Sequence, residues 1–332
     1  MKKSLFLFLL ISTGSFSQPT DPDVFQDLGY LINDALFFSK RYISPAAEAA
    51  TFGSSSGWLS SAKKRPIWDV TVGLHSNFFV VPKNNRAFGI KNTDFSFFSI
   101  QNATDATVPT ALGNDNQVYL IGQLGTEQIK LKTPQGINQD IIIYPHLSAN
   151  ISIWYGTEFL IKFAPITKLK KGDYQVYGVG LKHNLNQHFK WLQNKKINAA
   201  GLFCYSSEQI NFDFLDSQSS MGNIGINRLS GFIDTFQTQV NVSKEYKKIE
   251  LLAGLILNVS NDRYEFSGEK GEIENIIPLR SIFNEKLKEI SKTRSLVLGE
   301  VSCRYEISNF YLQTTLAFGK FVNSNVSIQY EF

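Results

Sequence analysis

The sequence has no apolar run long enough to cross a membrane as a helix. A spanning helix needs about 20 consecutive apolar residues, and the clearest apolar stretch, residues 5–11, is much shorter. The chain is therefore either exported as a soluble protein or crosses a membrane as strands. Strands need only about 10 residues each, because a closed barrel satisfies its backbone hydrogen bonds between neighbours.

Cysteine and methionine are scarce, with two of each in 332 residues. Small secreted disulfide scaffolds contain several closely spaced cysteines, so this class is excluded. Cys204 and Cys303 stand far apart in the sequence. They leave two interpretations open: one long-range disulfide, or two buried thiols on separate strands. No Cys-x-x-Cys pair is present, so the zinc sites built on that motif are absent too.

Neither positive nor negative charge dominates the sequence, since the net charge is only +4 and no long basic block occurs. This argues against a nucleic-acid partner. The four histidines, at positions 75, 146, 183 and 188, match neither a His-Glu-x-x-His motif nor a clear serine-partner position. We therefore expect no enzyme activity, no cofactor and no metal site.

Alternation of apolar and polar residues is abundant instead, together with 27 Phe and 13 Tyr, which favour strands and form the aromatic girdles of membrane barrels. In residues 322–332, Val326, Ile328, Tyr330 and Phe332 alternate with polar residues. A period of two predicts a strand with one apolar face. Closure of a barrel would pair this strand with the first one, which we expect to start near Ile67.

The alternation predicts an all-β fold, an antiparallel transmembrane β-barrel of about 12 strands with an N-terminal helical plug. Weak segments at 128–132 and 209–214 would raise the number to 14. The expected strands are 67–81, 88–100, 117–123, 140–155, 157–166, 174–184, 197–207, 229–243, 249–260, 295–306, 310–319 and 322–332. Most long loops then fall at one end of the barrel and the tight turns at the other, as such barrels require.

The chain before the strands divides into two parts. Residues 1–17 are typical of a signal peptide, with Lys2 and Lys3, an apolar stretch and a small-residue cleavage signature. Residues 18–65 form an N-terminal helix, expected over 21–42 and ended by Pro45, and a Gly/Ser-rich stretch. That stretch is either a linker or a segment packed inside the barrel; a plug would use Phe38, Phe52 and Trp58. Residues 66–332 form the barrel.

Several of these segments carry a family resemblance. The residues from Tyr42-Ile-Ser-Pro45 through Gly57-Trp58 to Phe79-Val-Val-Pro82 resemble an uncharacterised bacterial family of unknown function. The alternating residues Val326 to Phe332 resemble the terminal signal of Gram-negative outer-membrane β-barrels. The overall plan is similar to the long-chain fatty-acid transporter superfamily. This resemblance implies the cell outer membrane as location. It implies outer-membrane lipid, the barrel-assembly machinery and a small hydrophobic ligand as partners.

Polar residues on the non-lipid faces of the strands are candidates to line the lumen. They are Asp69, His75, Asn77, His146, Asn150, Lys162, Lys182, Asp234, Glu250, Glu300 and Arg304. They form either a polar solute path or a network that fills a closed lumen and holds the N-terminal segment. The first functional hypothesis is a channel or transporter for a small solute, which can be hydrophobic. The alternatives are a structural or docking barrel whose loops bind a partner, and a soluble exported β-rich binding module.

Overall fold

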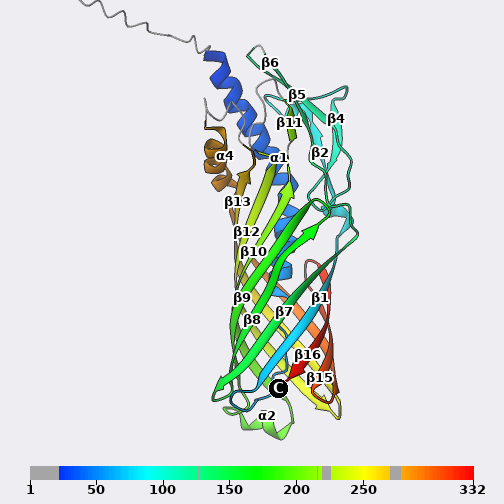
Figure 1. Cartoon of the computed structure of the whole chain (residues 1–332), viewed down its shortest axis with the longest axis vertical. Helices are drawn as coiled ribbons and strands as arrows, with labels where there is room; N and C mark the ends of the chain where they lie inside the picture. Colours follow the sequence, from blue (N-terminus) through cyan, green and yellow to red (C-terminus); the bar gives the residue numbers. More distant parts are fainter. Residues whose placement is uncertain (1–21, 126, 215, 219–225, 270–277) are drawn as a thin grey trace, which may run out of the picture.

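The computed structural model describes residues 22–125, 127–214, 216–218, 226–269 and 278–332. Its main body is a closed antiparallel barrel of ten strands in the order β1-β16-β15-β14-β13-β12-β10-β9-β8-β7 (Figure 1). The strands are β1 (Val70–Val80), β7 (Ile141–Trp154), β8 (Thr157–Leu169), β9 (Gly172–Asn184), β10 (Asn198–Asp213), β12 (Arg228–Tyr246), β13 (Ile249–Ser267), β14 (Lys292–Ile307), β15 (Phe310–Phe318) and β16 (Val322–Glu331). The predicted antiparallel β-barrel is thus confirmed, with ten strands and not about 12.

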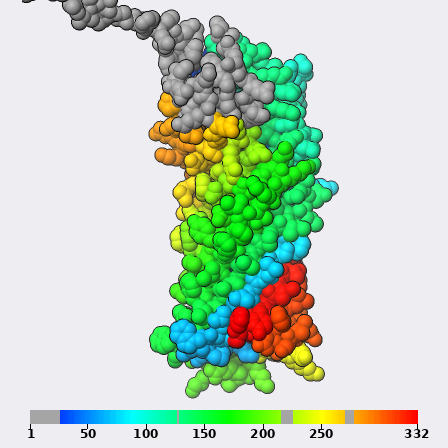
Figure 2. Space-filling view, in the orientation of Figure 1, coloured from blue at the N-terminus to red at the C-terminus, as the bar shows by residue number. Residues whose placement is uncertain are grey.

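Closure joins the first strand to the last. β16 pairs with β1 from Asn323 opposite Phe79 to Glu331 opposite Thr71, and the backbone N–H of Phe332 donates to Val70 O at 2.9 Å. In Figure 2 the two strands lie side by side near the lower end of the molecule. On its other edge β1 pairs with β7. Residues 81–140 therefore leave the barrel after one strand and return to it at β7.

The predicted number of strands was wrong because two expected strands belong to this excursion. The segments 88–100 and 117–123 form short strands of two to six residues, below the length that a tilted barrel strand needs. Their apolar side chains, such as Ile90, Ile100 and Leu120, are buried away from the barrel wall. The resulting sheets pair β2 (Ala87–Lys91) with β4 (Asp105–Pro109), and join β3 (Ser99–Ile100), β5 (Tyr119–Leu124), β6 (Glu127–Lys132) and β11 (Asp216–Gln218).

These sheets form a head at one end of the barrel, together with α4 (Leu279–Leu287) and the short helices η1 (Lys83–Asn85), η2 (Asn92–Asp94) and η3 (Lys288–Ile290). The opposite end, the turn end, contains the chain's last residue, the short connections β7–β8, β12–β13 and β14–β15, and α2 (Lys190–Asn194) (Figure 1). The signal peptide predicted for residues 1–17 lies outside the described residues.

Helix α1 (Pro22–Ser55) runs from the head down into the barrel (Figure 1). It continues through Pro45, contrary to the prediction that this proline ends it. An internal proline removes one helical hydrogen bond. Burial of the residues on both sides of Pro45 compensates for this loss, since Ile43, Ala46 and Ala47 are at most 3% exposed. Among the described residues, no helix is both long and apolar enough to cross a membrane.

The upper part of α1 organises the core of the head. Tyr42 packs against Phe212 and Phe214, and its hydroxyl donates to Gln135 O at 2.7 Å. Burial raises the pKa of Tyr42 far above its usual range, so the phenol stays a hydrogen-bond donor. Asp34 accepts the backbone N–H groups of residues 96–98. The head and α1 thus share one apolar core.

The barrel wall has an apolar band on its outer face. On β13 the outward residues from Ile249 to Val259 are apolar and mostly exposed, and the next outward residues are Asn261, Arg263 and Glu265. From Ile249 to Val259 the strand rises by ten residue steps of about 3.4 Å each. Because the strand is tilted, the apolar band is about 25 Å tall. The inward positions of the same stretch include Glu250, Asn258 and Ser260, all buried. The alternation in the sequence therefore separates an apolar exterior from a polar interior.

Candidate functional site

The polar interior converges on the end of α1, and Lys162 on β8 provides the central contact. Its Nζ donates to Ser56 O at 2.8 Å and to Gly53 O and Ser54 O at 3.3 Å. The last carbonyls of a helix have no partner within the helix and carry the negative end of its dipole. A buried ammonium at this position both satisfies these carbonyls and complements their partial charge.

Glu300 on β14 binds the next residue along the chain. It accepts the backbone N–H of Gly57 at 3.1 Å and the amide of Gln239 at 3.2 Å. Gly57 has a positive φ of 81°, the left-handed conformation in which helices commonly end and which glycine adopts without strain. A Cβ at this position would lie 3.2 Å from His146 Cε1. The lumen therefore fits this helix end closely.

Further side chains from the wall bind the segment that follows. Lys182 donates to Ser61 O at 2.7 Å and pairs with the equally buried Glu158 at 2.9 Å. Gln313 donates to Leu59 O at 2.9 Å and Asn184 to Ala62 O at 2.7 Å. The contacts with Ser61 O, Leu59 O and Ala62 O come from β9 and β15 and end on backbone atoms. Together with Lys162 and Glu300 they hold the backbone of residues 53–62 along the lumen.

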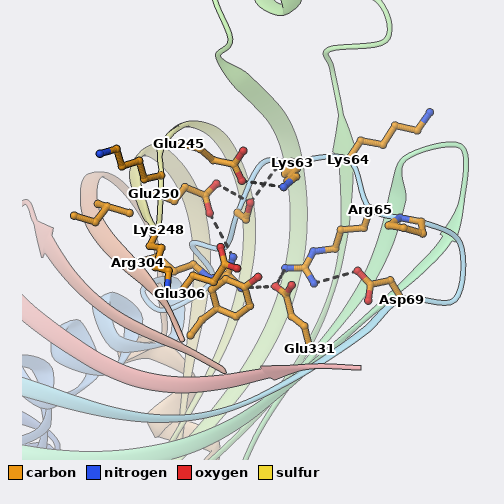
Figure 3. A pocket seen from close by; sticks show the side chains of 15 residues that line it. Lys63, Lys64, Arg65, Asp69, Glu245, Lys248, Glu250, Arg304, Glu306 and Glu331 are labelled. Carbon is orange, nitrogen blue, oxygen red and sulfur yellow. Dashed lines mark hydrogen bonds and ion pairs between the residues drawn. The ribbon is translucent and has the colours of Figure 1, made fainter. Parts of the chain in front are cut away.

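At the turn end the segment crosses the mouth of the barrel, beside a pocket of about 180 Å³. Figure 3 shows the side chains that line this pocket. Arg65 bonds Glu331 on β16 and Thr71 on β1, and lies 3.5 Å from Asp69. Arg304 on β14 also bonds Glu331 and lies 3.4 Å from Glu250. We call Arg65, Asp69, Glu331, Arg304 and Glu250 the mouth cluster. It ties the N-terminal segment to both strands of the closing seam.

Most predicted lumen residues lie on inward positions of their strands. His75 and His146 stack with ring centroids 4.4 Å apart; His75 contacts Ser148 and Asn325, and His146 contacts Asn77. Asn150, on the inward face of β7, is half-buried. Lys162, Lys182, Glu300, Glu250, Arg304 and Asp69 have the contacts given above.

Three predicted placements were wrong. Asp234 lies on the outer face of β12 with Phe236, where it accepts from Tyr205 at 2.9 Å and pairs with Arg263 at 2.7 Å; the strand's inward residues are the odd-numbered ones. Phe38 is buried in the head against Phe88 and Phe214, not in the barrel. Cys303 is exposed and unpaired, whereas Cys204 is a buried free thiol.

The other two plug candidates lie within the barrel. Phe52 is fully buried against Phe321, and the Trp58 indole packs near Lys162 at 5.5 Å. Of the two interpretations of the Gly/Ser stretch, the packed segment is the one observed: Ser54 contacts Thr235, Ser55 contacts Asn258 and Ser56 contacts Asn323. Small residues allow this approach to the wall.

Several residues that contact the lumen or its mouth were not predicted from the sequence. They are Arg65, Glu331, Glu158, Gln313 and Asn184. Glu331 and Gln313 occupy polar positions of alternating strands, so the period-two signal contained them. Arg65 precedes the first strand and no periodicity marks it. Its role arises only because the chain turns at the mouth.

The residues Gly53–Gly57 also satisfy the pattern Gly-x-Ser-x-Gly of serine hydrolases. That pattern is functional at a strand-to-helix turn that exposes the serine, whereas here it lies at a buried helix end. The Ser55 hydroxyl donates to Thr51 O at 2.8 Å, and no histidine bonds a serine of this stretch among the contacts of the described residues. Within the described ranges, no three His, Cys, Asp or Glu side chains gather as metal ligands.

The chain was compared with known proteins. The model of a family described as "Family of unknown function (DUF6588)" matches residues 1–332, and no curated protein matches. Among solved structures, the translocator domain of autotransporter NalP from Neisseria meningitidis is similar, with 10% identity over 89% of this chain and 99% of that chain, and a TM-score of 0.36.

Two further similar structures are the outer membrane protease OmpT from Escherichia coli and the toluene transporter TodX from Pseudomonas putida. OmpT has 10% identity over 82% of this chain and 100% of that chain, with a TM-score of 0.29. TodX has 7% identity over 84% and 95%, with a TM-score of 0.23. At TM-scores below 0.5, no activity is transferred to this chain.

Proposed function

Since the chain belongs to the DUF6588 family of unknown function, we propose a role from its own contacts: an outer-membrane β-barrel sealed by its own N-terminal segment, serving as a structural or docking barrel that carries the head. The apolar band supports the membrane location. So do the exposed aromatic residues Trp154, Tyr155 and Tyr246 at its turn-end edge, because aromatic girdles mark the interfaces of such barrels.

One observation carries the proposed seal. Lys162, Glu300, Lys182, Gln313 and Asn184 all bind backbone atoms of residues 53–62 inside the lumen. A solute that passed along the lumen would have to displace this segment and leave several buried charged groups without partners. Leaving a buried charge unpaired costs about 3–5 kcal/mol. The occupied lumen therefore favours an anchoring role over continuous conduction.

The head is the surface that such a barrel would offer to a partner. It extends the barrel by the short sheets and by α4, which comes from the long connection after β13. The outward face of β13 is polar beyond Val259, so this part would stand clear of the membrane. The partner would then bind the head without contacting the lumen.

A second candidate function, a gated channel for a small hydrophobic solute, is favoured by one cavity. It measures about 50 Å³ and lies between the small residues Ala46, Ala49, Ala50 and Gly53 of α1 and apolar residues such as Ile142 and Phe212. A displacement of α1 would widen this apolar space. The sealed barrel functions with α1 fixed in the lumen, whereas the gated channel requires α1 to move.

A disulfide lock separates the two functions. Ser54 Oγ and Thr235 Oγ1 are 3.1 Å apart, so Ser54→Cys with Thr235→Cys, in a Cys303→Ser background, would tie α1 to β12. We expect no measurable conductance in planar bilayers from either the oxidised or the reduced protein. Conductance that appears only on reduction would support the gated channel instead, and a conducting oxidised protein would contradict the seal. The single Ser54→Cys variant is the control.

Membrane insertion is tested independently by sodium carbonate extraction. The proposed barrel should stay in the membrane fraction and should shift its gel mobility on boiling. Release into the soluble fraction without detergent would favour the exported binding module.

A further inference from the structure

The turn end carries a set of exposed lysines that neither the seal nor the mouth cluster uses. They are Lys64, Lys190, Lys195, Lys196, Lys247 and Lys248, here called the turn-end lysines. Three of them lie in or beside α2, between β9 and β10, and two in the turn between β12 and β13. These two connections are neighbours, because the start of β10 pairs with the end of β12, with Asn198 opposite Ser243.

Carboxylates at this end do not neutralise these lysines. None of the turn-end lysines forms an ion pair within the described residues. Glu245 pairs with Lys63 at 3.0 Å, while Glu250, Asp69 and Glu331 belong to the mouth cluster. Glu306 is a further exposed carboxylate near the mouth. The surface around the mouth is therefore positively charged, and Figure 3 shows Lys64 pointing away from the pocket.

Exposed aromatic rings lie directly beside these lysines. Lys64 Nζ is 5.3 Å from the centre of the Tyr155 ring, and Trp191 of α2, 57% exposed, follows Lys190 in the chain. Tyr246 precedes Lys247 and is also exposed. Aromatic rings with lysines just beyond an apolar band match the depth of lipid headgroups, where the ring lies at the interface and the ammonium group reaches the phosphates.

Towards the head, the outward charges of β12 and β13 beyond the band include both signs. Asp234 and Arg263 pair at 2.7 Å, Arg228 pairs with Asp173 at 2.8 Å, and Glu265 is exposed. Exposed lysines such as Lys168 and Lys170 occur towards the head as well. A dissolved acidic protein could bind lysines at any place on the surface. It would not account for their position against exposed aromatic rings at one edge of the band.

We propose that the turn-end lysines bind the phosphate groups of anionic glycerophospholipids in the leaflet that surrounds this end of the barrel. The inference rests on the proposed membrane location. The lysines are spread over separate turns and do not converge on one pocket, an arrangement that fits several singly charged headgroups. A basic residue near an anionic membrane surface strengthens binding by about fivefold.

The test uses the full-length protein, purified in a neutral detergent. Native mass spectrometry would measure how much dioleoyl-phosphatidylglycerol and dioleoyl-phosphatidylcholine the protein retains from an equimolar mixture. The variant combines Lys190→Gln, Lys195→Gln and Lys248→Gln, which remove charge but keep hydrogen-bonding side chains. The matched control combines Lys83→Gln, Lys132→Gln and Lys170→Gln, three exposed lysines towards the head with the same change of charge.

We expect wild type and control to retain at least tenfold more phosphatidylglycerol than phosphatidylcholine, and the turn-end variant to lose this preference. Equal preference in variant and control, or none in wild type, would overturn the proposal. Lipid A that displaces phosphatidylglycerol from wild type but not from the variant would assign the lysines to the other leaflet. Carbonate-resistant insertion of the variant into phosphatidylcholine vesicles shows separately whether the proposed barrel itself holds.

Discussion

At the scale of single residues, the lumen is defined by side chains that bind backbone atoms. Lys162 is 1% exposed and donates to three carbonyls at the end of α1. The sequence predicted that this lysine faces the lumen, because it stands at a polar position of an alternating strand. It could not predict the partner, since the carbonyls belong to a segment more than a hundred residues earlier in the chain. For Asp234 the prediction itself was wrong. Its charge led us to expect it in the lumen, whereas the pairing of its strand places it on the outer face.

Replacing Lys162 by methionine should lower the stability of the folded barrel strongly. The variant removes the buried positive charge that acts on Glu300 and the donor to Ser56 O. It leaves Gly53 O and Ser54 O with the single donors Ser56 Oγ and Trp58 Nε1. Breaking a buried charged interaction costs about 3–5 kcal/mol. The measurement is the temperature at which the compact form is lost on a gel. Lys168→Met, at an exposed position of the same strand, should leave this temperature unchanged; an equal effect of both would refute the clamp.

Replacing Gly57 by alanine should destabilise by about 1–2 kcal/mol, because a side chain is strained at its φ of 81°. The added Cβ would also crowd His146. Urea titration followed by tryptophan fluorescence measures the difference. Gly89→Ala is the control, since no atom lies within 4 Å of the Cβ built there. A Gly57→Ala protein as stable as this control would show that the helix end is looser than we infer.

At the scale of elements, α1 and the closing seam depend on each other. Arg65 follows the segment that α1 leads into the lumen, and it bonds Thr71 on β1 and Glu331 on β16. Thr71 and Glu331 are themselves paired across the seam. The N-terminal segment thus stabilises the closure of the barrel from inside, in addition to filling it.

Arg65→Gln should therefore weaken the seam. The variant loses the ionic contacts with Glu331 and Asp69, and we expect about 1–3 kcal/mol of lost stability. Protease digestion in detergent is a suitable readout, because opening of the seam exposes the edges of β1 and β16. Lys64→Gln, one residue earlier and exposed, should be cleaved like wild type. If both variants resist cleavage equally, Arg65 does not contribute to closure.

At the scale of the whole molecule, the apolar band distinguishes a membrane barrel from a soluble one. Leu255 and Glu265 both point outward from β13, the first within the band and the second beyond it. In water an arginine would be tolerated at either position. In a bilayer, an arginine at the midplane of the lipid-facing surface costs about 2–4 kcal/mol.

Leu255→Arg should accordingly impair folding into lipid vesicles, whereas Glu265→Arg should fold like wild type. Folding yield after dilution from urea, read by the gel shift, provides the comparison. Equal yields for both variants would mean that the outer face of β13 does not contact hydrocarbon.

The sequence by itself determined the barrel class, the inward and outward faces of most strands and the polar nature of the lumen. Each of these follows from a period of two within one continuous segment, which folding cannot shift without exposing one whole face. Only the tertiary structure decided the number of strands, because the short strands within 88–100 and 117–123 pair inside the two small sheets of the head and not in the barrel wall. It also decided that α1 passes Pro45 and ends on Lys162. Both outcomes depend on burial against residues that are distant in the sequence, and a local pattern contains no information about such contacts.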